Sequence, residues 1–239
     1  ANEDTNYTQA TMEIPITVNV ADPILGNNTP EKIQEVARSG QAANIWSVGD
    51  TVPIHIDFTM NTTSINGTYY AVIIGFDHNS SVEGSNTIHF QIGKDASGND
   101  IAFVDSQYAG NAFDAAEFYM HDDTTLGYMG WKDCHIRKTI CPAFFTAFPL
   151  EWQKVITDCT KYSDNVGGKH DDVASVTSTQ DKIWLLSEFE IFGKCIYSNN
   201  AEQNYQKQYD YYKNGNSQKR YKHNSSNETA CNWWTRSVY

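Results

Sequence analysis

The amino-acid sequence predicts an α+β fold in one large domain, and three observations lead to this class. A helix with a capping residue is indicated at residues 29–40. The rest of the first half carries β-branched segments separated by turn residues, as antiparallel sheets do. The second half, from about residue 130, mixes short helical and extended patterns. This succession of elements is typical of an α+β protein.

The first 25 residues are predicted to form an N-terminal β arm, and residues 26–239 to form the domain. Residues 12–20 alternate in polarity and are β-branched, with Pro15 keeping the strand at an edge. No turn-linked hairpin partner follows, and an uncovered strand edge promotes aggregation. We therefore expect the arm to pack outside the domain core, against another chain or an upstream domain.

The next segment has the signature of an amphipathic helix. Thr29 is a suitable N-cap, and Pro30 suits the first helical position. Gly40 provides the stop signal. The apolar residues recur at the helical i, i+3, i+4 spacing: Ile33, Val36 and Ala37. These three side chains are predicted to face the core.

Four strands are predicted after this helix, each bounded by turn residues. The strands are Thr51–Phe58, Tyr69–Phe76, Thr87–Ile92 and Ile101–Asp105. The turns are Asn66-Gly67, Glu83-Gly84 and Ser97-Gly98. Neighbouring strands joined by such short turns pair antiparallel.

The second half is predicted to alternate between helix and strand. A short helix is expected at Trp131–Ile140 and a strand at Val155–Tyr162. Another strand, Ile183–Leu186, is expected to lead into a turn at Ser187–Gly193. Residues 201–213 are predicted to form an amphipathic helix, whose tyrosines have helical spacing and face the core: Tyr205, Tyr209 and Tyr212.

Composition and charge exclude several classes of protein. The formal net charge is −12, which disfavours general binding to the phosphates of a nucleic acid. No apolar run approaches 18 residues, so no membrane insertion is expected. The five cysteines are widely spaced without a C-x-x-C pair, which argues against a zinc site or a full disulfide framework. Most are expected to be buried free thiols, with one structural disulfide remaining open.

No known catalytic pattern is present, so we expect no enzyme, no cofactor and no tightly bound metal. The G-x-S-x-G, P-loop, G-x-G-x-x-G and H-E-x-x-H patterns are absent. Two acidic clusters, His121-Asp122-Asp123 and His170-Asp171-Asp172, lack the alternating oxygens of a calcium loop. Glu188 and Glu190 allow a hydrolase pair or a structural turn, and the apolar residues around them favour the turn.

A basic, tyrosine-rich segment at 205–223 is the candidate binding surface. It holds five Lys or Arg against one Asp, a net charge of +4 within an acidic protein. Tyr and Arg anchor protein contacts, and Asn adds adaptable hydrogen bonds. The candidate ligand-binding residues are Tyr211, Tyr212, Asn214, Asn216, Arg220 and Tyr221. In the alternative interpretation, the tyrosines fill the core and the lysines solvate its flank.

Six ordered motifs carry a resemblance to a known family. They contain residues expected to be structural: Trp46, Asp50, Trp131, Trp184, Glu188, Trp233, Trp234 and Arg236. The last motif, Trp233-Trp234-Thr235-Arg236-Ser237, stands near the end of the chain. Over residues 27–239 the chain resembles an uncharacterised domain family of gut Firmicutes and their bacteriophages.

The resemblance implies a C-type-lectin-like fold, akin to formylglycine-generating-enzyme and phage variable-adhesin proteins. It implies a non-enzymatic virion protein of a tail, fibre or head decoration that acts as a host-surface or glycan binding module. Its expected partners are other virion proteins or copies of itself, as a homo-oligomer. The alternatives are a purely structural virion protein and an adhesin that is extracellular or on the bacterial cell surface.

The resemblance also raises expectations for the end of the chain. Family members continue past the Trp-Trp-x-Arg-Ser motif through further strands that are not in this sequence, so the domain is expected to be C-terminally incomplete relative to the family. Trp233 and Trp234 are expected to be largely buried, because exposing two adjacent indoles is costly. Arg236 is expected to pair with Glu188 or Glu190.

Overall fold

The structure is a computed structural model of the chain, and it describes most of the sequence. The described residues are 20–60, 63–95, 97–101, 130–213, 220, 222–223, 230–231, 233 and 235–238. Residues 12–19 of the expected strand at 12–20 and most of the one at Ile101–Asp105 lie outside these residues, as do His121-Asp122-Asp123 and Trp234.

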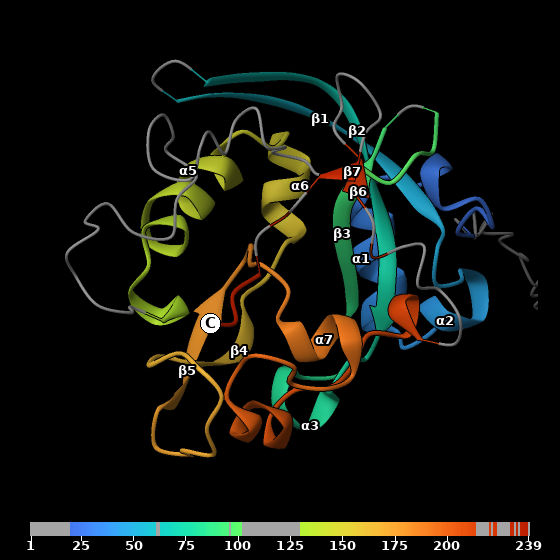
Figure 1. Cartoon of the computed structure of the whole chain (residues 1–239). Helices are drawn as coiled ribbons and strands as arrows, with labels where there is room; N and C mark the ends of the chain where they lie inside the picture. The colour runs from blue at the N-terminus through green and yellow to red at the C-terminus, as the bar shows by residue number, and fades with distance from the viewer. Residues whose placement is uncertain are drawn as a thin grey trace, which may run out of the picture.

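A three-stranded antiparallel sheet forms the first half, in the order β1-β2-β3 (Figure 1). The strands are β1 (Thr51–Met60), β2 (Thr63–Phe76) and β3 (Ile88–Lys94). The short helix α3 (Ser80–Glu83) connects β2 to β3. Inward and outward residues alternate along β1, which is typical of an antiparallel strand with one solvated face.

The predicted turn at Asn66-Gly67 is wrong. Both residues lie inside β2, where Asn66 pairs with Asp57 and Gly67 with Ile56. The two strands pair without a break from Thr51 to Met60. The ladder hydrogen bonds of this long hairpin therefore override the local turn preference of Asn-Gly.

The predicted first helix is confirmed as α1 (Pro30–Arg38). The Thr29 side chain accepts a hydrogen bond from the Lys32 backbone N–H, which caps the helix. The stripe of Ile33, Val36 and Ala37 is buried. A 3₁₀ helix, η1 (Leu25–Asn27), precedes α1, and α2 (Ala42–Ile45) follows it.

The end of the expected arm lies against the domain. Leu25 is buried in the main core, and the Asp22 carbonyl accepts a hydrogen bond from Trp46 Nε1 at 3.0 Å. These contacts hold Trp46 in place, which agrees with its expected structural role. The expectation that residues 1–25 pack outside the core is therefore wrong for Leu25 and for Ala21, which packs against the same core, whereas Ile24 is exposed.

The second half is helical and then extended. Its helices are η2 (Trp131–Asp133), η3 (Ile136–Ile140), α5 (Cys141–Thr146) and α6 (Leu150–Val155). A hairpin of β4 (Cys159–Asp164) and β5 (Val176–Asp181) follows, and then α7 (Glu188–Phe192). The last elements are η4 (Asn200–Asn204), η5 (Asp210–Tyr212) and the strand pair β6 (Lys222–His223) and β7 (Ala230–Cys231). Mixed helix and small antiparallel sheets confirm the α+β class.

Three predicted elements of this half need correction. The strand predicted at Val155–Tyr162 begins only at Cys159, because Val155 ends α6. Ile183–Leu186 forms no strand. The turn predicted at Ser187–Gly193 is the helix α7, with Ser187 and Gly193 as its two caps. Ser187 and Glu190 form a capping box that starts this helix.

The amphipathic helix predicted at 201–213 is also wrong. The chain forms two separate 3₁₀ turns there, η4 and η5. The backbone N–H of Tyr209 donates to the Glu190 carbonyl at 3.0 Å, instead of to the residue one helical turn earlier. This tertiary bond to α7 interrupts the helix, while Tyr209 and Tyr212 remain buried as expected.

The core has two parts, on opposite faces of the sheet. The larger one joins β1, alternate residues of β2, α1 and the helices of the second half. The smaller one packs Val72 and Ile74 of β2 against Tyr209, Tyr211 and Tyr212. The central strand β2 is therefore buried on both faces, and the 3₁₀ turn η5 covers the second face.

Candidate functional site

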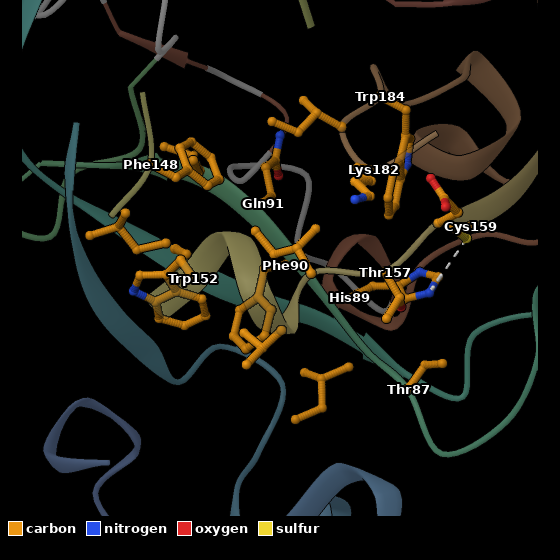
Figure 2. A pocket seen from close by; sticks show the side chains of 18 of the residues that line it. Thr87, His89, Phe90, Gln91, Phe148, Trp152, Thr157, Cys159, Lys182 and Trp184 are labelled. Carbon is orange, nitrogen blue, oxygen red and sulfur yellow. Dashed lines mark hydrogen bonds between the residues drawn. The ribbon is translucent and has the colours of Figure 1, made fainter. Parts of the chain in front are cut away.

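A cavity of about 670 Å³ lies between β3 and the helices α1, α5 and α6. Phe148 and Trp152 line one end of it, and Phe90 stands in its middle (Figure 2). At the other end lie Trp184 and Lys182. The size and the aromatic lining are those of small-molecule pockets, which measure roughly 300–1,000 Å³.

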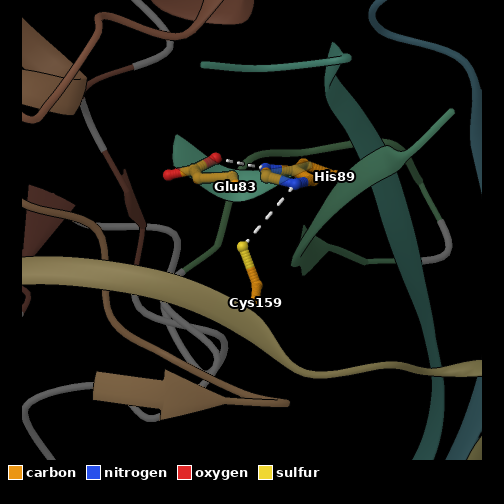
Figure 3. Close-up of side chains that lie close together, drawn as sticks. All are labelled: Glu83, His89 and Cys159. Carbon is orange, nitrogen blue, oxygen red and sulfur yellow. Dashed lines mark hydrogen bonds and ion pairs between the residues drawn. The ribbon is translucent and has the colours of Figure 1, made fainter. Parts of the chain in front are cut away.

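Polar side chains gather at the Trp184 end of the cavity. Glu83 from α3, His89 from β3 and Cys159 from β4 all line it. His89 contacts each of the other two (Figure 3). Its Nε2 is 3.9 Å from Cys159 Sγ, and its Nδ1 is 3.6 Å from Glu83 Oε2. The Tyr209 hydroxyl is also hydrogen-bonded to Nδ1, at 2.9 Å.

Lys161 joins this group to a buried ion network. Its side chain is fully buried, and its ammonium donates to Glu83 Oε1 at 2.7 Å and to Glu190 Oε1 at 3.2 Å. A third hydrogen bond, of 2.9 Å, goes to Tyr209 Oη. An ammonium has three N–H donors, so all of them are used. The ammonium also lies 4.4 Å from the centre of the Trp184 ring.

Arg236 completes the network, which confirms the expected pairing with Glu190. Its two terminal nitrogens donate to both oxygens of Glu190, at 2.5 and 2.8 Å. Nε donates to Ser163 Oγ at 2.9 Å, and Nη1 also donates to the Leu185 carbonyl at 2.7 Å. Burial alone would raise the pKa of Glu190, but Arg236 and Lys161 outweigh it and hold that pKa well below its usual range.

Glu188 is held separately from this ion pair. Its carboxylate accepts the backbone N–H groups of Ile196, Tyr197 and Ser198, at 2.7 to 3.2 Å. It thus closes the loop that follows α7. The hydrolase pair is not supported, because each carboxylate is occupied by structural partners.

Burial sets the protonation of the groups at the cavity wall. It raises the pKa of Glu83 to about 7, despite the opposing effect of Lys161. It raises the pKa of the Cys159 thiol to about 12 and, together with Lys161, holds the pKa of His89 well below 6.5. At neutral pH the thiol and the imidazole are neutral, so Cys159 is not an activated nucleophile.

His78 supports Tyr209 from the opposite side. The two rings stack at 3.6 Å with an interplanar angle of 13°. Burial lowers the pKa of His78 to about 3. Two neutral histidines and one cationic lysine therefore surround the tyrosine hydroxyl and ring.

The predicted binding surface is largely a core feature in the structure. Tyr211 and Tyr212 are 1% and 0% exposed. Their hydroxyls bond to Asp100 at 3.1 Å and to Gln91 at 2.5 Å. Arg220 is half-buried, with its guanidinium 5.0 Å from the centre of the Phe192 ring. The tyrosines therefore cannot offer flat faces to a ligand, while Asn214, Asn216 and Tyr221 lie outside the described residues.

The remaining motif residues have structural partners in the structure. Trp131 Nε1 donates to Asp181 at 2.9 Å, and Asp50 accepts the Ser47 N–H at 2.9 Å. Trp233 is half-buried and donates to the Arg220 carbonyl at 3.1 Å, two residues after β7. The structure thus places this indole beside the strand pair of β6 and β7.

Sequence reasoning missed the group at the cavity wall. Its members come from positions far apart in the chain: Glu83, His89, Cys159, Lys161 and Tyr209. No local pattern joins them. The Ser187-x-x-Glu190 capping box was a usable signal for α7, and with it for the buried position of Glu190.

The fold and the site together define an α+β protein with a ligand-sized cavity and a buried ion network at its wall. Residues 112–239 match the family model of DUF6273, a domain of unknown function. The match covers more than half of the chain, so the chain belongs to this family. No curated protein and no solved structure matches the chain. Among the described residues, no helix has the length and apolar character needed to cross a bilayer.

Proposed function

We propose that this chain is a non-enzymatic binding module of a bacteriophage virion, which holds a host-surface glycan in its cavity. The observation that carries the proposal is the 670 Å³ cavity with aromatic walls and polar groups at one end. Aromatic faces stack on sugar rings, and a few polar groups then set the orientation of a ligand. The half-buried Phe90 and Trp184 offer such faces.

Among the described residues, the state of the thiol and of two buried carboxylates supports a binding role for the cavity. The thiol at the wall keeps its proton at neutral pH, and the carboxylates of Glu188 and Glu190 are held by structural partners. The ion network therefore serves to shape the wall. On this proposal, the polar end selects the ligand through Gln91, Lys182 and Trp184.

The virion assignment rests on the resemblance to domains of gut Firmicutes and their phages. We propose a C-type-lectin-like fold with an N-terminal β arm that joins it to other virion proteins or to further copies of the chain. The small antiparallel sheets and short helices are compatible with this fold. A tail, a fibre or a head decoration would each present the cavity to the host surface.

A matched pair of phenylalanine variants tests the cavity. Phe90→Ala removes an aromatic wall, whereas Phe189→Ala removes a half-buried phenylalanine that does not line the cavity. Binding of the full chain to an array of host cell-wall glycans should be lost in the first variant and kept in the second. Trp152 and Trp184 line the cavity, so ligand binding should also change the intrinsic fluorescence.

The alternatives give different results. Incorporation into virions without any glycan signal would favour a purely structural virion protein. Binding to cells by a chain encoded away from phage genes would favour a bacterial surface adhesin. Equal loss of binding in both phenylalanine variants would contradict the cavity as the ligand site.

A further inference from the structure

We propose that Glu83, His89 and Cys159 form a zinc site at the wall of the cavity. Each offers one donor atom, and the three atoms lie within 4.8 Å of one another (Figure 3). Carboxylate oxygen, imidazole nitrogen and thiolate sulfur are the three donor types that zinc takes in proteins. The inference does not rest on the proposed glycan binding, since a metal can bind here whatever ligand the cavity holds.

The distances lie within reach of a zinc ion. Bonds of about 2.3 Å to sulfur and about 2.0 Å to nitrogen place these atoms roughly 3.6 Å apart at a tetrahedral angle. Cys159 Sγ and His89 Nε2 are 3.9 Å apart, so a small shift of the thiol closes the difference. The Glu83 oxygen lies within 4.8 Å of each of the other two donor atoms, so its carboxylate has to turn toward the metal.

Glu83 can make this movement at low cost. Its Oε1 is bound by Lys161, but its buried Oε2 accepts no hydrogen bond from any described residue. A buried acceptor without a partner is costly, so a ligand that satisfies it stabilises the folded state. Oε2 itself gives up no hydrogen bond among the described residues when it binds a metal, provided that Oε1 keeps its bond to Lys161 as the carboxylate turns.

Neighbouring groups complete the site. With zinc on Nε2 of His89, Nδ1 carries the proton and donates it to Tyr209 Oη, 2.9 Å away. Metal-binding histidines usually have such an outer hydrogen bond. All three donors line the cavity, so the fourth zinc position faces it and is open to water or to a ligand atom.

The net charge of the metal-bound site stays low when the thiol loses its proton. The carboxylates of Glu83 and Glu190 offset the cations of Lys161 and Arg236, so thiolate and zinc add a single positive charge. The other group of possible ligands, His78, Glu83 and Glu190, is a weaker candidate. The ammonium of Lys161 already binds both of its carboxylates and occupies the cation position.

Cobalt(II) substitution tests this site in the full, reduced chain. Cobalt takes the place of zinc and shows a near-ultraviolet charge-transfer band only when a thiolate binds it. We expect this band in the wild type and its removal by added zinc. Cys159→Ser should abolish the band. It should also reduce zinc affinity by more than about 100-fold, because mutating a residue that only hydrogen-bonds to a metal ligand already reduces metal affinity by about 10–100-fold.

Cys141→Ser is the matched control. Cys141 is also a buried free thiol that lines the cavity, but it belongs to neither group of possible ligands among the described residues. It should leave the band unchanged. A band of equal strength in Cys159→Ser, or no band in the wild type, would overturn the proposal. Should Cys159→Ser fail to fold, Glu83→Gln decides instead: unchanged zinc affinity in this variant would contradict the site.

Discussion

Arg236 and Glu190 form a fully buried, bidentate ion pair that connects the last described segment of the chain to helix α7. Arg236 also donates to Ser163 of β4 and to the Leu185 carbonyl. One side chain thus connects β4, the segment before α7 and the Trp-Trp-x-Arg-Ser motif. The expected structural role of this motif has a physical basis in that contact.

Replacing Arg236 with Met should lower the free energy of unfolding by about 3–5 kcal/mol, because a buried carboxylate then loses its main partner. Urea denaturation measures this change. Lys213→Ala is the control, since the pair of Lys213 and Asp210 is partly exposed and worth at most about 0.5 kcal/mol. A similar decrease in the free energy of unfolding in both variants would show that the buried pair of Arg236 and Glu190 stabilises the fold no more than an exposed ion pair does.

Glu83 should make the protein less stable as the pH rises from about 4.5 to about 7. Its pKa is raised from 4.5 to about 7, so the folded state holds the proton more tightly than the unfolded state does. Stability is then greatest below the unfolded pKa and falls as the pH rises through the folded one. The pKa values of His78 and His89 are lowered, so these two residues make the protein more stable as the pH rises toward about 6.5, opposite to the effect of Glu83.

The difference between the wild type and Glu83→Gln isolates this effect. Glutamine does not ionise, so the variant should gain stability relative to the wild type across this pH interval. Denaturation midpoints at several pH values measure the difference, in buffer without zinc. A difference that does not vary with pH would contradict the raised pKa.

Gly130→Ala should destabilise the protein by about 3 kcal/mol, at the upper end of the usual cost of overpacking. A Cβ at this position would overlap the backbone of Asp164 and Asn165, which cannot move aside easily. Gly67→Ala is the control, because its Cβ would meet only Tyr69, at an ordinary 3.7 Å. Thermal melts of the two variants should therefore differ clearly, and equal melts would argue against this packing.

Arg220→Ala should leave glycan binding intact while costing at most about 1 kcal/mol of stability. The guanidinium stacks on Phe192 and bonds to the Tyr212 carbonyl, so its removal loses one cation–π contact and one hydrogen bond. Loss of binding in a well-folded variant would instead support the basic, tyrosine-rich segment at 205–223 as the ligand surface.

Local signals in the sequence predicted the elements that depend on local interactions. The cap at Thr29 and the apolar stripe after it identified α1, and β-branched residues bounded by turn signals identified β1. The predictions of a turn at Asn66-Gly67 and of a helix at 201–213 were wrong because hydrogen bonds to other elements outweighed the local preference. In the first case these are the ladder hydrogen bonds between β1 and β2. In the second case, the hydrogen bond from Tyr209 to the Glu190 carbonyl replaced a helical one.

The sequence predicted only one contact of the candidate site, the ion pair that a buried arginine requires. Burying Arg236 requires a carboxylate, and that requirement pointed to Glu188 or Glu190, of which the structure pairs Glu190 with it. By contrast, His89 and Cys159 stand 70 positions apart, and their meeting depends on how β3 packs against β4. Neither residue carries a pattern that predicts this contact.

The buried network has a consequence for how the chain is divided. Lys161, Glu190 and Tyr209 belong to the segment that matches the family model, whereas His78, Glu83 and His89 precede it. A protein cut at residue 112 would leave the ammonium of Lys161 without one of its two carboxylates and expose one face of the tyrosine cluster. The residues that match the family model and the residues that share this buried network therefore have different boundaries in this chain.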